Sequence, residues 1–157
     1  MMKQRILLVM GEAAWTLKAI HLACTIARRE NRDLVLVKMV EMQHTGWLGM
    51  PEEGVDLTLE ERRVWKNCVN TAHDYGVTPA TEYFQYVDLT EAIPQAAEQY
   101  EASVVFATLP SYRFGFWRKF QLGLLERHMR QQGCALYTLA PTDPQADWTP
   151  SVVVSHQ

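Results

Sequence analysis

The chain alternates nearly continuous apolar runs with stretches whose apolar residues recur every three or four positions. Arg5–Met10 and Leu34–Val40 are apolar at almost every position, which is typical of strands buried on both faces. Between them, Leu17, Ile20 and Cys24 follow the spacing of an amphipathic helix. A strand, a helix and a second strand in this order form a right-handed unit in which the two strands are parallel. This pattern therefore predicts an open parallel sheet.

The same alternation continues to about residue 139. A capping box of Thr58 and Glu61 predicts a helix that runs to about Tyr75. The later predicted elements are a strand over Thr81–Val87, a helix over Glu91–Tyr100 with Thr90 as its N-cap, a strand over Ser103–Ala107, a helix over Gln121–Gln132 and a strand over Cys134–Leu139. The predicted fold class is α/β: a five-stranded, mostly parallel sheet with helices on both faces in a Rossmann-like three-layer sandwich. One domain over 1–141 is expected, followed by a flexible, proline-rich tail over 142–157.

Charge and hydropathy exclude several classes of function. The net charge is −3 and the pI is about 5.9, so bulk charge gives no reason to expect nucleic acid as a partner. No apolar run is long enough to cross a bilayer, and the first apolar run is too short for a secretory signal. We therefore expect a cytoplasmic protein.

No set of residues indicates catalysis. The three cysteines lie far apart without a CxxC pair, which predicts buried free thiols. The histidines and acids show no spacing suited to a metal site or to a coupled acid–base pair. The expectation is a protein that is not an enzyme and that holds no metal.

The turn after the fourth predicted strand is rich in aromatic and cationic residues. At this place α/β proteins usually bind a phosphate through small residues and a helix N-terminus, and bulky side chains block that approach. We expect Phe120 and one of Phe116 or Trp117 to enter the core and the other rings to form a partner surface. The candidate partner surface comprises Tyr112, Arg113, Phe114, Phe116, Trp117, Arg118 and Lys119, with Trp47 in an acidic loop as a second candidate. A protein partner ranks first, a membrane surface second and nucleic acid last.

Three segments carry a family resemblance. Leu89–Ala107 resembles the helix that leads into the fourth strand of universal stress proteins. Val35–Glu41 resembles their second strand, and Gly133–Leu139 their last strand. The order and spacing of these segments extend the resemblance over nearly the whole chain, up to Pro141.

The chain departs from the pattern of the ATP-binding members of that family. They carry an aspartate just after the first strand, where this chain has Gly11 and Glu12. Their phosphate loop reads G-x-x-G, nine residues, then G followed by Ser or Thr. The first two glycine places fall here on Thr108 and Ser111, or on Pro110 and Arg113, according to the direction of counting. The third falls on Gly123, and it is followed by Leu124. Without these glycines the backbone amides cannot easily approach a triphosphate, so ATP is disfavoured and no cofactor is expected.

The resemblance also implies a homodimer that pairs through the last strand. The candidate dimer strand contributes Cys134, Leu136, Tyr137 and Leu139. The resulting hypothesis is a non-enzymatic regulatory or scaffold protein of the stress response that acts through protein contacts. Two alternatives remain: an ATP- or nucleotide-binding sensor with an altered loop, and an accessory subunit docked on a larger membrane-associated complex.

Overall fold

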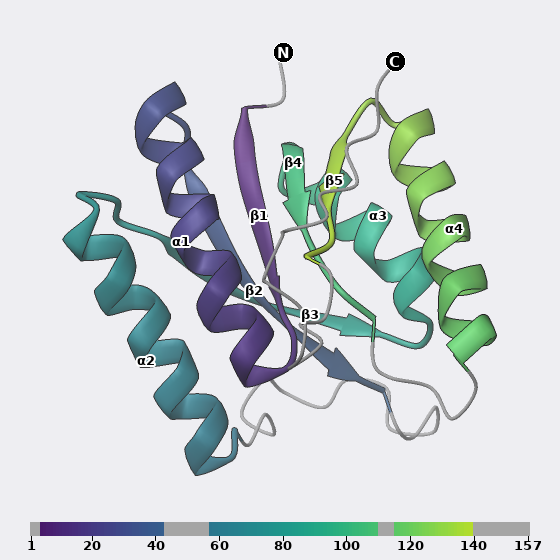
Figure 1. Ribbon diagram of the computed structural model, residues 1–157, viewed down its shortest axis with the longest axis horizontal. Coiled ribbons are helices and arrows are strands. Elements are labelled where there is room, and N and C mark those ends of the chain that lie inside the picture. The colour runs from purple at the N-terminus through teal and green to yellow at the C-terminus, as the bar shows by residue number, and fades with distance from the viewer. Residues whose placement is uncertain (1–3, 43–56, 110–114, 140–157) are drawn as a thin grey trace, which may run out of the picture.

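Five parallel strands form one sheet in the computed structural model, which describes residues 4–42, 57–109 and 115–139 (Figure 1). The strands are β1 (Arg5–Met10), β2 (Leu34–Glu41), β3 (Ala80–Tyr86), β4 (Ala102–Phe106) and β5 (Ala135–Tyr137), in the order β3-β2-β1-β4-β5. The helices are α1 (Ala13–Glu30), α2 (Leu59–Asp74), α3 (Leu89–Gln99) and α4 (Gly115–Gln131). The predicted fold class is confirmed.

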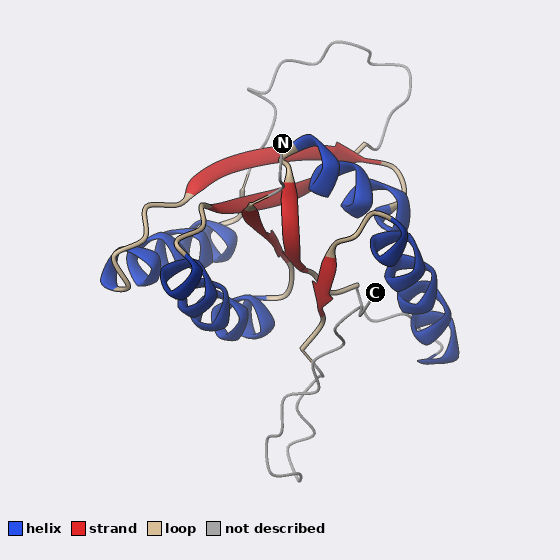
Figure 2. Ribbon diagram, turned by 90° about the horizontal axis from the view of Figure 1, so that it is seen from above, coloured by secondary structure: helices blue, strands red, loops and turns tan. Residues whose placement is uncertain are grey.

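The central strand is buried on both faces of the sheet. Ile6 and Leu8 of β1 pack in the core beneath α1 and α2, whereas Leu7 and Val9 pack in the core beneath α3 and α4. Figure 2 shows these helix pairs on opposite sides of the sheet. Successive side chains of a strand point to opposite faces, so a strand that is apolar at every position needs a helical cover on each side.

The helix starts show one confirmed cap and one corrected cap. The capping box of α2 is present: Thr58 Oγ1 accepts from the Glu61 N–H at 3.1 Å, and Glu61 Oε1 accepts from the Thr58 N–H at 3.3 Å. The predicted N-cap of α3, Thr90, is wrong. Asp88 is the cap and its Oδ1 accepts from both the backbone N–H and the hydroxyl of Thr90, at 3.0 and 2.8 Å. A carboxylate accepts hydrogen bonds more strongly than a hydroxyl, so Asp88 caps the helix. Thr90 is a buried residue of the first turn of α3.

Helix α4 and strand β5 differ most from the sequence-based expectation, whereas the bounds of β2, β3, α3 and β4 differ by one or two residues. Helix α4 begins at Gly115, six residues before the predicted start at Gln121. Strand β5 spans Ala135–Tyr137, half the predicted length. The predicted tail over 142–157 lies outside the described residues.

The three cysteines are buried free thiols, as predicted. Burial raises the pKa of Cys24 and of Cys68 to about 11. Cys134 Sγ donates to the carbonyl oxygen of Ala102 at 3.0 Å and so links the start of β5 to the start of β4. Cys24 and Cys68 serve packing, because a buried thiol with a raised pKa is a poor nucleophile.

Replacing Thr58 with Ala should lower the free energy of unfolding by about 1 kcal/mol, because the Glu61 N–H at the start of α2 loses its acceptor. Urea denaturation followed by circular dichroism measures the loss. Thr25→Ala is the matched control: Thr25 is exposed within α1, and its hydroxyl donates to the His21 carbonyl and caps no helix. Equal losses in the two variants would contradict the role assigned to the cap.

Candidate functional site

The chain adds β2 and β3 on one side of β1 and then β4 and β5 on the other, so the strand order reverses between β1 and β4. At such a point α/β proteins most often bind ligands. Gly11 follows β1 at this edge, and Thr108 lies just beyond β4. A Cβ added to Gly11 would lie 3.0 Å from Thr108 Cγ2, so a side chain here would have to push Thr108 aside. The Gly11 N–H donates to Thr16 Oγ1 at 3.0 Å. This backbone amide is therefore engaged within the protein.

A pocket of about 500 Å³ opens beside this point, between the start of α1, the end of β2 and the start of α2. We call it the carboxyl-edge pocket. Its apolar wall includes Met10, Val64 and Trp65. Trp65 also stacks on Tyr83, with ring centroids 5.7 Å apart. The volume suits a small organic molecule.

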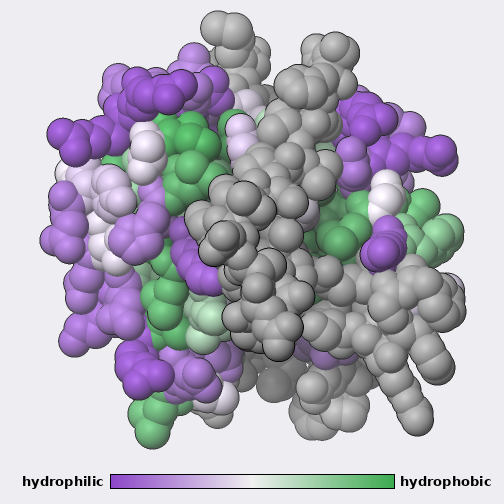
Figure 3. Space-filling model, in the orientation of Figure 1, coloured by the Kyte–Doolittle hydropathy of each residue, from purple (hydrophilic) through white to green (hydrophobic). Residues whose placement is uncertain are grey.

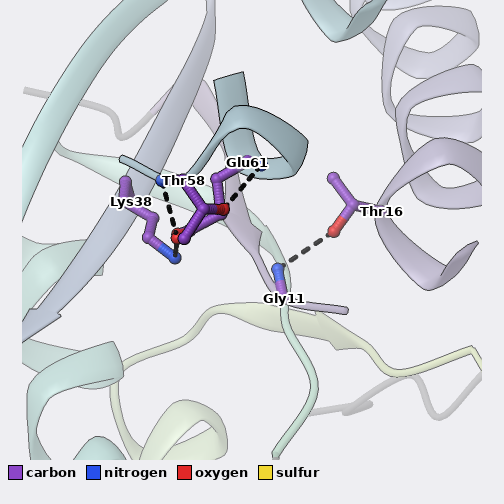
Figure 4. A network of polar contacts seen from close by, with 5 residues as sticks. All are labelled: Gly11, Thr16, Lys38, Thr58 and Glu61. Carbon is purple, nitrogen blue, oxygen red and sulfur yellow. Dashed lines mark hydrogen bonds and ion pairs between the residues drawn. The ribbon is translucent and has the colours of Figure 1, made fainter. Parts of the chain in front are cut away.

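The described charges of the carboxyl-edge pocket are mainly negative. Glu12, Glu60 and Glu61 face a single cation, Lys38, whose Nζ pairs with Glu61 (Figure 4). The hydrogen bond from Lys38, together with those from Thr58, holds the pKa of Glu61 below its usual range. The cation of the pocket is thus already neutralised. An excess of carboxylates repels a triphosphate.

A row of large apolar side chains runs along the outside of α4. Trp117 is 46% exposed, Phe120 56% and Leu124 37%, and these three residues form what we call the α4 stripe. The rings of Trp117 and Phe120 stack with centroids 5.8 Å apart. On the α4 side of the molecule, at the right of Figure 3, apolar surface adjoins hydrophilic surface. Contiguous exposed apolar surface of this kind is typical of an interaction site.

The structure places part of the predicted partner surface. Trp117 and Lys119 are exposed on α4, as expected. Phe116 and Arg118 belong to the same helix, but their side chains lie outside what the structure describes. Four predicted residues lie outside the described residues altogether: Trp47, Tyr112, Arg113 and Phe114.

The expectation that Phe120 enters the core is wrong. Leu125 and Met129 fill the core side of α4, with Leu122 packed against that core, and Phe120 is carried to the outer side. Leu124 was missed as a surface residue. The signal was the spacing of Trp117, Phe120 and Leu124, which lie on one face of a helix that starts before residue 117.

The candidate dimer strand faces inward. Cys134, Leu136 and Leu139 are buried in the two cores, and Tyr137 is half-buried with its ring stacked on Phe106 at 4.9 Å. These side chains serve the protomer, so any partner strand would have to use the backbone edge of β5. Among the described residues no strand pairs with that edge.

Two further classes of feature are absent from the described part of the chain. No three His, Cys, Asp or Glu side chains gather there in a way that could hold a metal ion. None of its helices combines the length and apolar character that crossing a membrane requires.

Comparison with known proteins identifies the fold. No protein-family model and no curated protein matches the chain. A universal stress protein family member from Burkholderia pseudomallei matches with a TM-score of 0.57 and 21% identity, over 88% of this chain and 97% of its own. A universal stress protein solved with cAMP gives 0.60 and 11%, over 90% and 100%. The Archaeoglobus fulgidus universal stress protein solved with dAMP gives 0.58 and 11%, over 89% and 100%. The chain has the universal stress protein fold.

The structure also bears on Gly123, the residue matched to the third glycine of the ATP-binding pattern. It lies inside α4, eight residues after the helix starts. A backbone N–H in a helix interior donates to the carbonyl four residues earlier, so it does not point at a phosphate as a loop amide does.

We expect MgATP at millimolar concentration to give no saturable heat in isothermal titration calorimetry, because the pocket carboxylates repel phosphate and the Gly11 amide is engaged. Adenosine is the matched control ligand, since it has the same base and sugar as ATP without the charged triphosphate. Micromolar binding of MgATP would contradict this expectation.

Proposed function

We propose that this chain with a universal stress protein fold is a non-enzymatic regulatory or scaffold protein whose contact surface is the outer face of α4. The α4 stripe is the observation that carries the proposal. Three large apolar side chains in contact with water reduce solubility, and a partner that covered them would gain the hydrophobic free energy of their burial. Aromatic side chains also dominate the energetics of protein interfaces.

The chemistry of the described residues supports a non-catalytic role. Cys24 and Cys68 have pKa values raised to about 11 by burial, which leaves little thiolate at neutral pH. His21 lies at the surface with Nδ1 3.1 Å from the hydroxyl of Tyr75 and has no carboxylate partner among the described residues. Neither environment resembles that of an activated nucleophile or base.

Ligand sensing at the carboxyl-edge pocket is a second candidate function. Its volume of about 500 Å³ favours this reading, as do the two universal stress proteins solved with cAMP and dAMP. The carboxylates of this pocket favour a neutral or cationic ligand over a nucleoside triphosphate. Native mass spectrometry of the gently purified protein would reveal a retained small molecule.

The variant Trp117→Ala with Phe120→Ala should remain folded and lose the proteins that co-purify with the wild type, because both rings lie on the outer face. Leu59→Ala with Val87→Ala is the matched control, since these side chains are 85% and 73% exposed, on α2 and on the turn between β3 and α3. The control should keep its partners. If the first variant unfolds, the rings are structural; if it keeps its partners, the contact surface lies elsewhere.

We also propose a homodimer through the backbone edge of β5. Tyr137 O accepts from the Ala107 N–H at 3.2 Å, so Tyr137 directs its backbone toward β4. Since alternate residues of a strand direct their backbone groups to opposite sides, Leu136 directs its groups to the open edge of β5. Thr138 follows β5 directly and would supply the next edge N–H when a partner strand extends the pairing.

Replacing Thr138 with Pro removes an edge N–H and should convert the dimer to the 18.1 kDa monomer in sedimentation velocity. Thr138→Val keeps the N–H and should remain dimeric. A wild type that sediments as a monomer, or a proline variant that stays dimeric, would refute the pairing.

A further inference from the structure

We infer that the outer face of α4 binds an acidic amphipathic helix of a partner protein. This inference rests on the proposed function and names the chemistry of its partner. It follows from three properties of α4: the spacing of its exposed residues, the sign of its free charges and the empty space at Gly123.

Four of the exposed residues of α4 follow a heptad. Trp117, Phe120, Leu124 and Arg127 occupy relative positions 0, 3, 7 and 10, the spacing with which a helix presents a seam to another helix. All four are exposed. The seam covers about 15 Å at 1.5 Å per residue, so a partner helix of about three turns would match its length.

The charges on this face select an acidic partner. Glu126 is the only acid in α4, and it pairs with Arg130 at 2.9 Å. Lys119 and Arg127 are exposed and make no ion pair with any described residue. Arg127 ends the seam, so a carboxylate opposite it would form a bidentate pair. A second copy would present the same cations and be repelled, which argues against α4 pairing with itself.

Gly123 adds an independent observation. A glycine inside a helix is unfavourable, and this one has neither a positive φ nor a neighbour that a Cβ would approach within 4 Å. Nothing in the described chain therefore requires glycine at this position. It adjoins the seam between Phe120 and Arg127, where the absence of a side chain lets a second helix backbone approach closely.

Two designed peptides test the charge, and a third, described last, tests the geometry. Each is a 15-residue helix with Leu at the heptad a and d positions; one carries Glu at the flanking positions and the other Lys. We expect fluorescence anisotropy to show at least tenfold tighter binding of the Glu peptide at low salt. A Glu peptide of the same composition with a scrambled heptad should bind at least tenfold more weakly.

Variants of α4 then locate the binding. Arg127→Glu cancels the charge of Lys119 and should abolish the preference for the Glu peptide, whereas Arg29→Glu, an exposed charge reversal on α1, should leave that preference unchanged. Gly123→Val should weaken binding of the Glu peptide at least tenfold, and Gly123→Ala should weaken it less. Circular dichroism checks that every variant is folded.

The outcomes separate this inference from the proposed function. If neither peptide binds while the Trp117→Ala, Phe120→Ala variant still loses its co-purifying proteins, the inference is wrong and the proposed function stands. If that variant keeps those proteins as well, both fail. Binding of the wild type to phosphatidylserine vesicles, with loss in the same variant and no peptide binding, would assign α4 to a membrane and overturn the inference.

Discussion

The burial of β1 on both faces is the constraint on which the rest of the structure depends. Ile6, Leu7 and Leu8 are fully buried, and their side chains alternate between the two faces of the sheet. Each face therefore needs its own helical layer, which α1 and α2 supply on one side and α3 and α4 on the other. The helices also fix the two candidate sites, since the starts of α1 and α2 frame the carboxyl-edge pocket and α4 presents the stripe.

Helix α4 has more apolar surface than the sheet can cover. Leu125 and Met129 satisfy the core on one side of the helix. Trp117, Phe120 and Leu124 lie on other positions of the same helix and contact solvent. A helix that served only to cover the sheet would carry polar residues there. This surplus of apolar surface, next to cations that pair with no described residue, is the physical basis for assigning α4 a partner.

The sequence predicted the parts of the fold that depend on periodicity. Each of these parts could be predicted from a short stretch of sequence: the buried strands from apolar runs, the core cysteines from the absence of a CxxC pair, and the cap at Thr58 from its spacing to Glu61. The start of α4 could not be predicted in this way. The helical spacing of the aromatic residues after Gly115 becomes apparent only once the helix is known to begin there. Phe120 was misplaced for the same reason. The carboxyl-edge pocket is formed by segments far apart in the sequence, and Lys38 meets Glu61 only after the sheet and α2 have packed.

Site-specific photo-crosslinking in the source cell tests the central claim most directly. A photoreactive phenylalanine analogue at Phe120 would report what lies against the α4 stripe, and the same analogue at exposed Leu59 would report background contacts. The account predicts a discrete crosslinked protein at Phe120 that is absent at Leu59. No crosslink at Phe120, or the same products at both positions, would contradict it.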